Sequence, residues 1–595
     1  MINSYAIGIS TLSAGQRAMD LVGQNIANAT TPGYHRQVVS LTSRATSANQ
    51  GSGVEIKRFD RYNVPALRSS ILQANSEKAR LDTQLGSQRQ VESLFTTGEG
   101  ALDGRLEQFF TQAEQLSSRP EDPALRRIVV DRAANLSGRF NELTKDLTEL
   151  RGGVGREVSV TVDAINSLTP RIAELNERIS STEGLGSQAN DLRDQRDTLV
   201  NELASYIDVR VTEQDSGVVN IVGGNTALVV GNLGTKLEAT SVPNGNLAVR
   251  LVGSPTDLRI TSGKLAGLLT EHNQGIPQYR TQLDTLATKL IEKVNGVLST
   301  GLGGSGPVTF AGGSTSVVDP TQPLATQNLT IPAQAGNLAI SVTDTATGAR
   351  TLSNIAIDPA TQSLQDIATA ITTGTSNRVT ATVDPGTNTL QFSAQNGFAF
   401  DFSARLPSTP DNVVMGGTAV PTVTGTYSGE TNETYSFQIV GSGTIGTTPG
   451  LSLEVRDSAN TLLSTVDVGS NYIPGEPLVV GNGLSVRLSA GTTTNGTFTA
   501  SPQVQADTAN LLPALGVGGL FVGTNAASIG VRSEIIADPT KLATSRSGQP
   551  GETSNLVRLS QLSEEKILSG GTQTFRGYFG ETVGLVGLTV NSASI

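Results

Sequence analysis

Three aspartates, Asp191, Asp194 and Asp197, stand three residues apart and would share part of one face of a helix. Carboxylates grouped in this way are one arrangement that could hold a metal ion. Arg193 and Arg196 are interleaved with them, and no histidine lies nearby in the sequence. Because arginines at helical spacing neutralise carboxylates, the pattern favours a network of ion pairs, solvated or facing another subunit, over a metal site.

A glycine-rich stretch, Gly301-Leu302-Gly303-Gly304-Ser305-Gly306, fits the G-x-G-x-x-G pattern of dinucleotide-binding loops. Such a loop follows a strand and opens a helix. Here a predicted helix precedes the glycines, and a predicted strand, 307–310, follows them. We therefore interpret the stretch as a flexible turn between domains. No G-x-S-x-G nucleophile elbow is present, and the middle of the chain offers no convergent acid and base residues, so we expect no enzyme activity, such as that of a peptidoglycan hydrolase.

The composition excludes several other kinds of site. The 595 residues include no cysteine, which rules out disulfides and thiolate chemistry, and only two histidines, His35 and His272. The net charge of −11 argues against a nucleic-acid partner. The chain has no apolar run of about 18 residues and no basic-then-apolar N-terminus, so we expect neither membrane insertion nor a cleaved secretory signal. We expect no cofactor and no metal.

Helical periodicity dominates both ends of the chain, and alternation of apolar and polar residues dominates the middle. We predict helices over 62–150, about 157–181 with Pro170 as a possible kink, 188–207, 262–299, 508–516 and 553–584. We predict strands over 209–260 and 301–505, interrupted by a helix around 364–371. The expected class is α+β multidomain, an elongated helical bundle formed by the terminal regions with inserted β-rich outer domains.

This reading divides the chain into seven parts. The expected boundaries are 1–60 (N-terminal axial helix and loop), 61–215 (helical bundle), 216–265 (small β segment), 266–300 (returning helix), 301–415 and 416–505 (two β-rich outer subdomains), and 506–595 (return to the helical domain).

The N-terminal helix carries an apolar stripe of coiled-coil type, which we call the seam. Its residues recur at heptad spacing: Ile2, Tyr5, Ile9, Leu12, Met19 and Ile26. An apolar ridge at this place needs a partner to cover it, either in the same chain or in another subunit. A loop with turn chemistry then ends the helix, because Pro32 lacks an amide hydrogen and Gly33 can take a positive φ.

Several strings resemble known proteins. The loop residues Asn28, Thr31, Pro32, Gly33 and Tyr34 resemble the signature of the axial proteins of the bacterial flagellum (rod, hook and hook-associated proteins). Arg36 and Gln37, the string at 190–197 and the strings at 262–269, 550–556 and 574–579 resemble the hook-associated protein 1 family in particular. The helical signature of that family falls on Asn190, Asp191, Asp194, Gln195, Arg196 and Asp197.

The resemblance implies a structural role at the junction between hook and filament. It implies partners: further copies of the chain in a ring, the hook protein, a second junction protein and an export chaperone. It also implies an extracellular location, reached through the flagellar secretion apparatus without a cleaved signal peptide. The resemblance implies a long amphipathic terminal helix that pairs with the N-terminal one and begins near Leu585. Because the sequence ends at Ile595, we expect either a truncated chain or an altered terminal pairing. Two alternatives are another axial protein, of hook or distal rod type, and a β-rich surface adhesin with helical anchoring.

Overall fold

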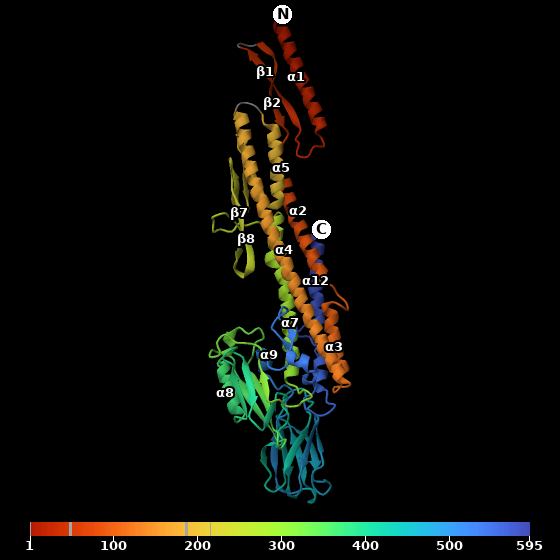
Figure 1. Ribbon diagram of the computed structural model, residues 1–595. Coiled ribbons are helices and arrows are strands. Elements are labelled where there is room, and N and C mark those ends of the chain that lie inside the picture. The colour runs from red at the N-terminus through yellow and green to blue at the C-terminus, as the bar shows by residue number, and fades with distance from the viewer. Residues whose placement is uncertain (1, 47–49, 185–187, 215, 595) are drawn as a thin grey trace. The chain divides into compact units, whose positions relative to one another are not determined.

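The computed structural model of this protein describes residues 2–46, 50–184, 188–214 and 216–594 (Figure 1). Helices and small antiparallel sheets build it, which confirms the expected α+β multidomain class. The chain forms two compact units, each made of segments that are distant in sequence. Unit 1 comprises Met1–Phe95, Asp146–Arg280 and Val583–Ile595; unit 2 comprises Thr96–Lys145 and Thr281–Thr582. Within the described ranges, no helix is both long and apolar enough for a membrane span.

Unit 1 begins with a helix and a β-hairpin. Helix α1 (Ile2–Ala27) is followed by strands β1 (Gln37–Thr46) and β2 (Gln50–Arg61), which pair antiparallel. α1 contacts this hairpin, and its buried apolar side chains are Ala14 and Leu21. We expected only a loop after the helix, so the hairpin is an addition to the sequence-based description.

Besides the last residues of α12 (Phe575–Ser594), four helical segments form the rest of the described helical part of unit 1. They are α2 (Pro65–Leu94), the later part of α4 (Pro123–Gly184), α5 (Asn190–Tyr206) and α6 (Lys264–Thr270), which continues through a π-helical turn (Glu271–Gly275) into α7 (Ile276–Ser299). α2 contacts both α5 and α6. Gly267 of α6 allows this approach, because a Cβ there would lie 2.8 Å from the carbonyl oxygen of Arg80.

The prediction of a separate helix beginning near residue 157 is wrong. α4 runs without interruption from Pro123 to Gly184, through Gly152, Gly153 and Gly155 and past Pro170. Glycine lowers helix propensity by only about 1 kcal/mol per residue, and the buried residues on both sides of the glycines outweigh this cost. These include Leu147, Val154, Val158 and Val162.

Two small sheets complete unit 1, as the alternation over 209–260 predicts. The first has the strand order β3-β4-β5-β6 and the second is the hairpin β7-β8. Their bounds are β3 Val209–Glu213, β4 Val219–Gly223, β5 Thr226–Val230, β6 Leu233–Gly234, β7 Leu237–Val242 and β8 Asn246–Leu251.

The helical part of unit 2 is held together by aromatic packing. The rings of Phe110 and Phe575 stack with centroids 5.9 Å apart, and Phe109 meets Phe521 at 5.8 Å. The helices of unit 2 besides its parts of α4 and α7 are α3 (Leu102–Ser117), α8 (Leu364–Gly374), α9 (Leu511–Leu515), α10 (Ser533–Ala537), α11 (Ser554–Gln561) and α12 (Phe575–Ser594), whose last residues belong to unit 1. The helices predicted over 508–516 and 553–584 are therefore present, the second divided into α11 and α12.

The first β-rich core of unit 2 packs two three-stranded sheets, β11-β10-β14 and β12-β13-β9, with α8 and α9. Phe392, Phe400 and Leu511 are fully buried in it. The strands are β9 Phe310–Gly312, β10 Gly336–Asp344, β11 Arg350–Ile357, β12 Val379–Val383, β13 Leu390–Ala394 and β14 Phe398–Asp401.

The second β-rich core contains the strand order β15-β24-β17-β19-β20 beside the sheet β16-β22-β21 and the pair β18-β23. Phe437 and Phe498 stack at 4.7 Å within it. Leu406 and Met415 already belong to this core, ahead of the division expected after residue 415. The strands are β15 Asp411–Val414, β16 Pro421–Gly425, β17 Tyr435–Val440, β18 Ser442–Thr444, β19 Ser452–Arg456, β20 Leu462–Asp467, β21 Leu478–Gly481, β22 Leu484–Leu488, β23 Thr492–Thr494 and β24 Thr497–Ala500; the short β25 Phe521–Val522 and β26 Gly530–Val531 pair separately.

Candidate functional site

The loop between α1 and β1 is closed by a single amide side chain. Asn25 donates from Nδ2 to the carbonyl oxygen of Gln37 at 2.9 Å, and its Oδ1 accepts from the Gln37 amide at 2.9 Å. The Tyr34 hydroxyl donates to the same Oδ1 at 2.8 Å. The end of the helix is thereby fixed to the start of the strand.

The loop is held to α5 by an ion-pair network, which we call the junction network: His35, Arg61, Arg68, Asp194 and Asp197. His35 Nδ1 lies 2.8 Å from Asp194 Oδ1. Arg61 bridges the two carboxylates, with Nη1 2.7 Å from Asp194 Oδ1 and Nη2 2.5 Å from Asp197 Oδ2. Arg68 of α2 pairs with the other oxygen of Asp197. Three segments of unit 1 therefore converge on two carboxylates of α5.

Burial makes these contacts stronger than surface ion pairs. The Arg61 side chain is 5% exposed and that of Asp197 is 2% exposed. Burial alone would raise the pKa of the Asp194 carboxyl, but hydrogen bonds from His35 and Arg61 more than offset it, so the pKa lies below its usual value. The carboxylate is therefore stabilised as the anion.

Two further contacts join the loop to α5. Asn190 donates from Nδ2 to the side-chain oxygen of Gln37 at 3.0 Å and to the carbonyl oxygen of Phe59 at 2.9 Å. Gly33 has φ +82°, and a Cβ there would lie 2.4 Å from Thr198 Oγ1. The turn therefore requires glycine both for its backbone conformation and for its close approach to the helix.

The loop at 28–37 and the helical string at 190–197 thus lie together in one site. The sequence alone did not indicate that these two strings contact each other. The other loop residues have local roles: Thr31 Oγ1 donates to Asn28 Oδ1 at 3.2 Å, the exposed Pro32 follows, and Arg36 lies over the Tyr62 ring at 5.2 Å. Asp191 and Gln195 are exposed on α5. The interpretation of the aspartates as sharing one face needs correction, because a helix places Asp191 and Asp197 about 120° apart.

The network is also internal to the chain, so the expectation that it is solvated or faces another subunit is wrong. Arg196 is fully buried and donates from Nη1 to the Gly217 carbonyl at 2.6 Å and to Asn176 Oδ1 at 3.1 Å. Arg193 pairs with Glu183 at 2.7 Å. The statement that no histidine lies near the aspartates holds in sequence only, since His35 reaches Asp194 in the fold.

Ligand atoms of His35, Asp194 and Asp197 lie within 4.8 Å of one another, close enough to be considered for a metal ion. The guanidinium of Arg61 contacts both carboxylates, and that of Arg68 contacts the second. Two cations already neutralise the two anions, and they would repel a divalent ion. The chemistry of this group is therefore that of a structural ion-pair network.

The seam residues of α1 remain uncovered in the described molecule. The exposed fractions are 76% for Tyr5, 54% for Ile9, 66% for Leu12, 75% for Met19 and 71% for Ile26. Ile2 belongs to α1, but its side chain lies outside the described residues. The face of α1 opposite the hairpin is therefore an apolar surface.

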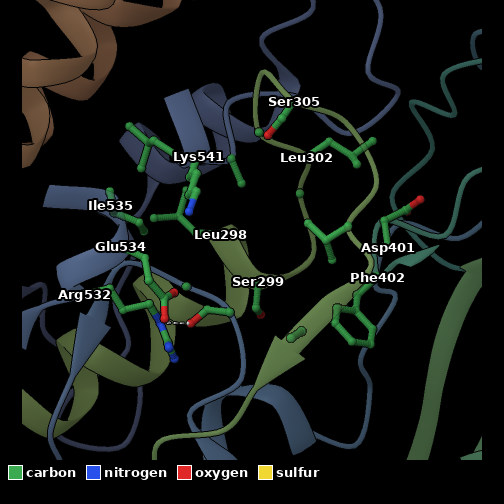
Figure 2. Close-up of a pocket in the computed structure, with 18 of the residues that line it drawn as sticks. Leu298, Ser299, Leu302, Ser305, Asp401, Phe402, Arg532, Glu534, Ile535 and Lys541 are labelled. Carbon is green, nitrogen blue, oxygen red and sulfur yellow. Dashed lines mark hydrogen bonds between the residues drawn. The ribbon is translucent and has the colours of Figure 1, made fainter. Parts of the chain in front are cut away.

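The glycine-rich stretch at 301–306 lines a cavity of about 240 Å³ in unit 2 (Figure 2). Figure 2 shows Lys541, Arg532 and Glu534 on one wall, with Asp401 and Phe402 opposite them. The Leu302 amide donates to the Ser545 carbonyl at 2.6 Å, and the Gly304 amide donates to the Thr540 carbonyl at 2.8 Å.

These two amides are engaged by carbonyl oxygens and are not free to bind a phosphate. The expectation of a flexible turn is wrong, because the same hydrogen bonds anchor the stretch. Gly301 is needed for close packing, since a Cβ there would lie 2.2 Å from Asn555 Nδ2.

Several residues of the junction were missed at the sequence level. Arg61 and Arg68 lie outside both motifs, and nothing local distinguishes them from surface arginines. The hairpin carried a detectable signal, because Val39 and Leu41 alternate with polar residues in β1, and Val54 and Ile56 do so in β2 after the glycines of its first residues.

Comparisons with known proteins agree with the motifs. Residues 88–312 match the model of the flagellar hook-associated protein FlgK helical domain, and residues 6–35 match that of the flagella basal body rod protein. Flagellar hook-associated protein 1 of Salmonella typhimurium is 31% identical over 303 residues, covering 48% of this chain and 55% of the relative. The Escherichia coli protein of that name is 28% identical over 332 residues, covering 53% and 61%.

The chain thus spans a little over half the length of these two relatives. Flagellar hook-associated protein 1 of Bacillus subtilis is 25% identical over 400 residues, covering 58% of this chain and 78% of the relative. The solved flagellar hook junction protein FlgK from Burkholderia pseudomallei has 19% identity and a TM-score of 0.47, covering 88% of this chain and 96% of that one. The matches in sequence confirm the resemblance to hook-associated protein 1.

Proposed function

We propose that this chain is a structural component of the flagellar axis that joins hook to filament, and that it assembles through its terminal helices. The observation that carries the proposal is the uncovered seam of α1, which stands next to a loop matching axial proteins. The helical domain that follows matches hook-associated proteins. The matched proteins are structural, and the proposal includes the absence of enzyme activity.

The seam supplies the driving force for assembly. Burying one large apolar side chain stabilises an interface by about 1.5–3 kcal/mol. The five described seam residues are each more than half exposed, so a helical partner would gain most of this contribution at each of them. The contribution of one seam is small, so repetition around a ring of identical subunits would be needed to make the contact firm.

The junction network supports the proposal by fixing the direction of the seam. An assembling helix must present its apolar face at a set angle to the rest of the subunit. Asn25 ties the end of α1 to β1, and Arg61 ties the end of β2 to α5. The loop and the network would therefore transmit the orientation of the helical domain to the axial helix.

The partners follow from this role. The seam would contact terminal helices of neighbouring copies, of the hook protein and of a second junction protein. An export chaperone would cover the same apolar surface before assembly. The protein would reach the cell exterior through the flagellar secretion apparatus without a cleaved signal peptide.

The experiment compares variants in a strain from which the gene is deleted. Leu12→Asp places a charge in the seam, and we expect loss of motility and release of unassembled filament protein into the medium. Ser13→Asp is the matched control, since it adds the same charge at the adjacent flanking position, where coiled coils tolerate charge. Circular dichroism of both purified variants checks that the rest of the chain is folded.

Two outcomes would contradict the proposal. Normal motility of the Leu12→Asp strain would show that assembly does not depend on the seam. If filaments still form on hooks in the deletion strain itself, the chain is not the protein that joins hook to filament.

A further inference from the structure

A second cavity in unit 2, of about 280 Å³, has an unusual charge pattern. Arg350, Arg405 and Arg546 line it, and no Asp or Glu is among its described lining residues. A guanidinium presents several N–H donors in a planar fork that matches a carboxylate or phosphate. Three of them around one small cavity favour an anionic ligand.

Arg405 is the one arginine of the three with a carboxylate in direct contact. Its Nη2 lies 2.6 Å from Asp401 Oδ2 and 2.9 Å from Thr343 Oγ1, and its side chain is 12% exposed. This ion pair fixes the arginine at the cavity wall. The Arg405 charge is therefore balanced within the protein, and the other two arginines decide what the cavity attracts.

Arg350 and Arg546 donate to neutral acceptors. Arg350 Nε reaches the Leu406 carbonyl at 3.2 Å, and Arg546 Nη2 reaches the Gln503 carbonyl at 2.7 Å. Arg546 is 7% exposed, and its Nε has no hydrogen-bond partner among the described residues. The nearby Glu552 is engaged by Ser545 and by the Arg546 and Ser547 amides. A buried cation with an unpaired donor is costly, and an anion close to the guanidinium lowers the electrostatic part of that cost.

Burial and a neighbouring arginine both lower the pKa of Arg350, and the same holds for Arg546. Burial and Arg405 lower the pKa of Arg350, and burial and Arg558 lower the pKa of Arg546 to about 10. The carboxylates of Asp401 and Glu552 act in the opposite sense on Arg350 and Arg546 respectively, and offset part of their charge. An anion in the cavity would relieve the repulsion that remains.

The remaining wall is mixed, with the polar residues Ser403, Thr424, Thr426, Gln503, Ser547 and Gln549 beside apolar and aromatic ones. It contains Leu406, Val423, Pro502 and the half-buried Tyr427, whose ring meets that of Tyr435 at 6.1 Å. The apolar part of this wall offers contacts to the body of an organic ligand that an inorganic ion cannot use. The volume is at the lower end of ligand pockets and suits a molecule of about one sugar residue.

We propose that this cavity binds a small organic carboxylate, with Arg350 and Arg546 holding the carboxylate and Tyr427 with its apolar neighbours contacting the body. The inference is independent of the proposed function, because it concerns the β-rich part of unit 2 and uses no residue of the seam or the junction network.

The test is titration calorimetry of the full chain at constant ionic strength with D-glucuronate, D-galacturonate, succinate, D-glucose and sodium sulfate. We expect binding of at least one of the three carboxylates and none of glucose. Binding of a uronate would assign a sugar acid, and binding of succinate alone would assign an acyclic carboxylate such as an acidic side chain.

Arg350→Gln carries the mutational test, because Arg350 is partly exposed and its side chain makes one hydrogen bond among the described residues, to the Leu406 carbonyl. We expect at least tenfold weaker binding in this variant and the same in Arg546→Gln if that variant remains folded by circular dichroism. Arg487→Gln is the control, since Arg487 lies on β22 outside the cavity. No binding of any carboxylate, unchanged affinity in Arg350→Gln, or equally strong binding of sulfate would each overturn the proposal.

Discussion

His35 Nδ1 lies 2.8 Å from Asp194 Oδ1, a contact that joins the loop after α1 to a helix 159 residues later in the chain. The backbone amide of His35 donates to the other oxygen of the same carboxylate at 3.2 Å. One side chain of α5 therefore holds both the backbone and the side chain of the loop. The position of α1 depends on this clamp, on Gly33 and on the Arg61 bridge.

Loss of Arg61 should loosen this junction. Arg61→Met leaves Asp194 and Asp197 buried without their shared cation, and breaking a buried ion pair costs about 3–5 kcal/mol. We expect faster hydrogen–deuterium exchange over 28–37 and 190–206 and a lower temperature for the first unfolding transition. Exchange is the better measurement, because a chain of two units need not unfold in one step.

Arg58→Met is the matched control for this prediction. Arg58 pairs with Asp60 on the same strand, but the two side chains are 54% and 39% exposed. Exposed pairs contribute at most about 1 kcal/mol. Equal exchange rates in the two variants would show that the junction network does not stabilise the loop.

Gly33→Ala tests the turn itself. The φ of +82° costs a residue with a Cβ about 1–2 kcal/mol, and the new methyl group would also meet Thr198 Oγ1. We expect destabilisation of the loop, read from exchange over 28–37. The double variant Gly33→Ala with Thr198→Ala should recover the steric part and leave the backbone part. Full recovery would show that the positive φ is not required.

The sequence allowed the loop after α1 and helix α5 to be predicted, but not the contact between them. α5 was expected over 188–207 and spans Asn190–Tyr206, because its apolar spacing is regular. The loop was predicted from Pro32 and Gly33. Nothing in either string indicates that they touch, because the contact depends on how β2 and α2 bring Arg61 and Arg68 to α5.

The failed predictions have local physical reasons. The break in α4 was expected at glycines that the fold tolerates, because tertiary packing on both flanks outweighs propensity. The first hairpin was missed although its alternation is detectable, because the strong turn signal at Pro32 and Gly33 favoured a loop for the whole stretch after the helix. The alternation at Phe437, Gln438 and Ile439 was correctly interpreted, since β17 alternates strictly between buried and exposed residues.

The glycines of α4 give a third prediction. Gly152→Ala should stabilise the helix by about 0.5–1 kcal/mol, because the new Cβ meets only the flexible Arg156 side chain at 3.6 Å. Gly155→Ala should lose this gain, since its Cβ would lie 3.3 Å from two atoms of the buried His272 ring. Exchange rates over 146–184 compare the two variants. Equal stabilisation by both would show that the His272 ring can move aside.

Glu552 gives a prediction for acid conditions. Burial would raise the pKa of this carboxyl, but hydrogen bonds from Ser545, Ser554 and the Ser547 and Arg546 amides lower it to about 2, against an ordinary value of 4.5. Because the folded pKa is depressed, the stabilisation is complete above about pH 4.5 and is lost as the pH falls toward 2. Wild-type protein should therefore become sensitive to pepsin near 545–555 over this range.

Glu552→Gln should remove this pH dependence, because the amide does not titrate, and should lower stability by about 1.5–3 kcal/mol at pH 7 through loss of charged hydrogen bonds. Pepsin cleavage rates at several pH values between 2 and 4.5, with thermal unfolding at pH 7, measure both effects. Glu564→Gln, at an exposed position after α11, is the control and should follow the wild type. If Glu552→Gln keeps the wild-type pH profile, the acid sensitivity of this segment must come from another carboxyl.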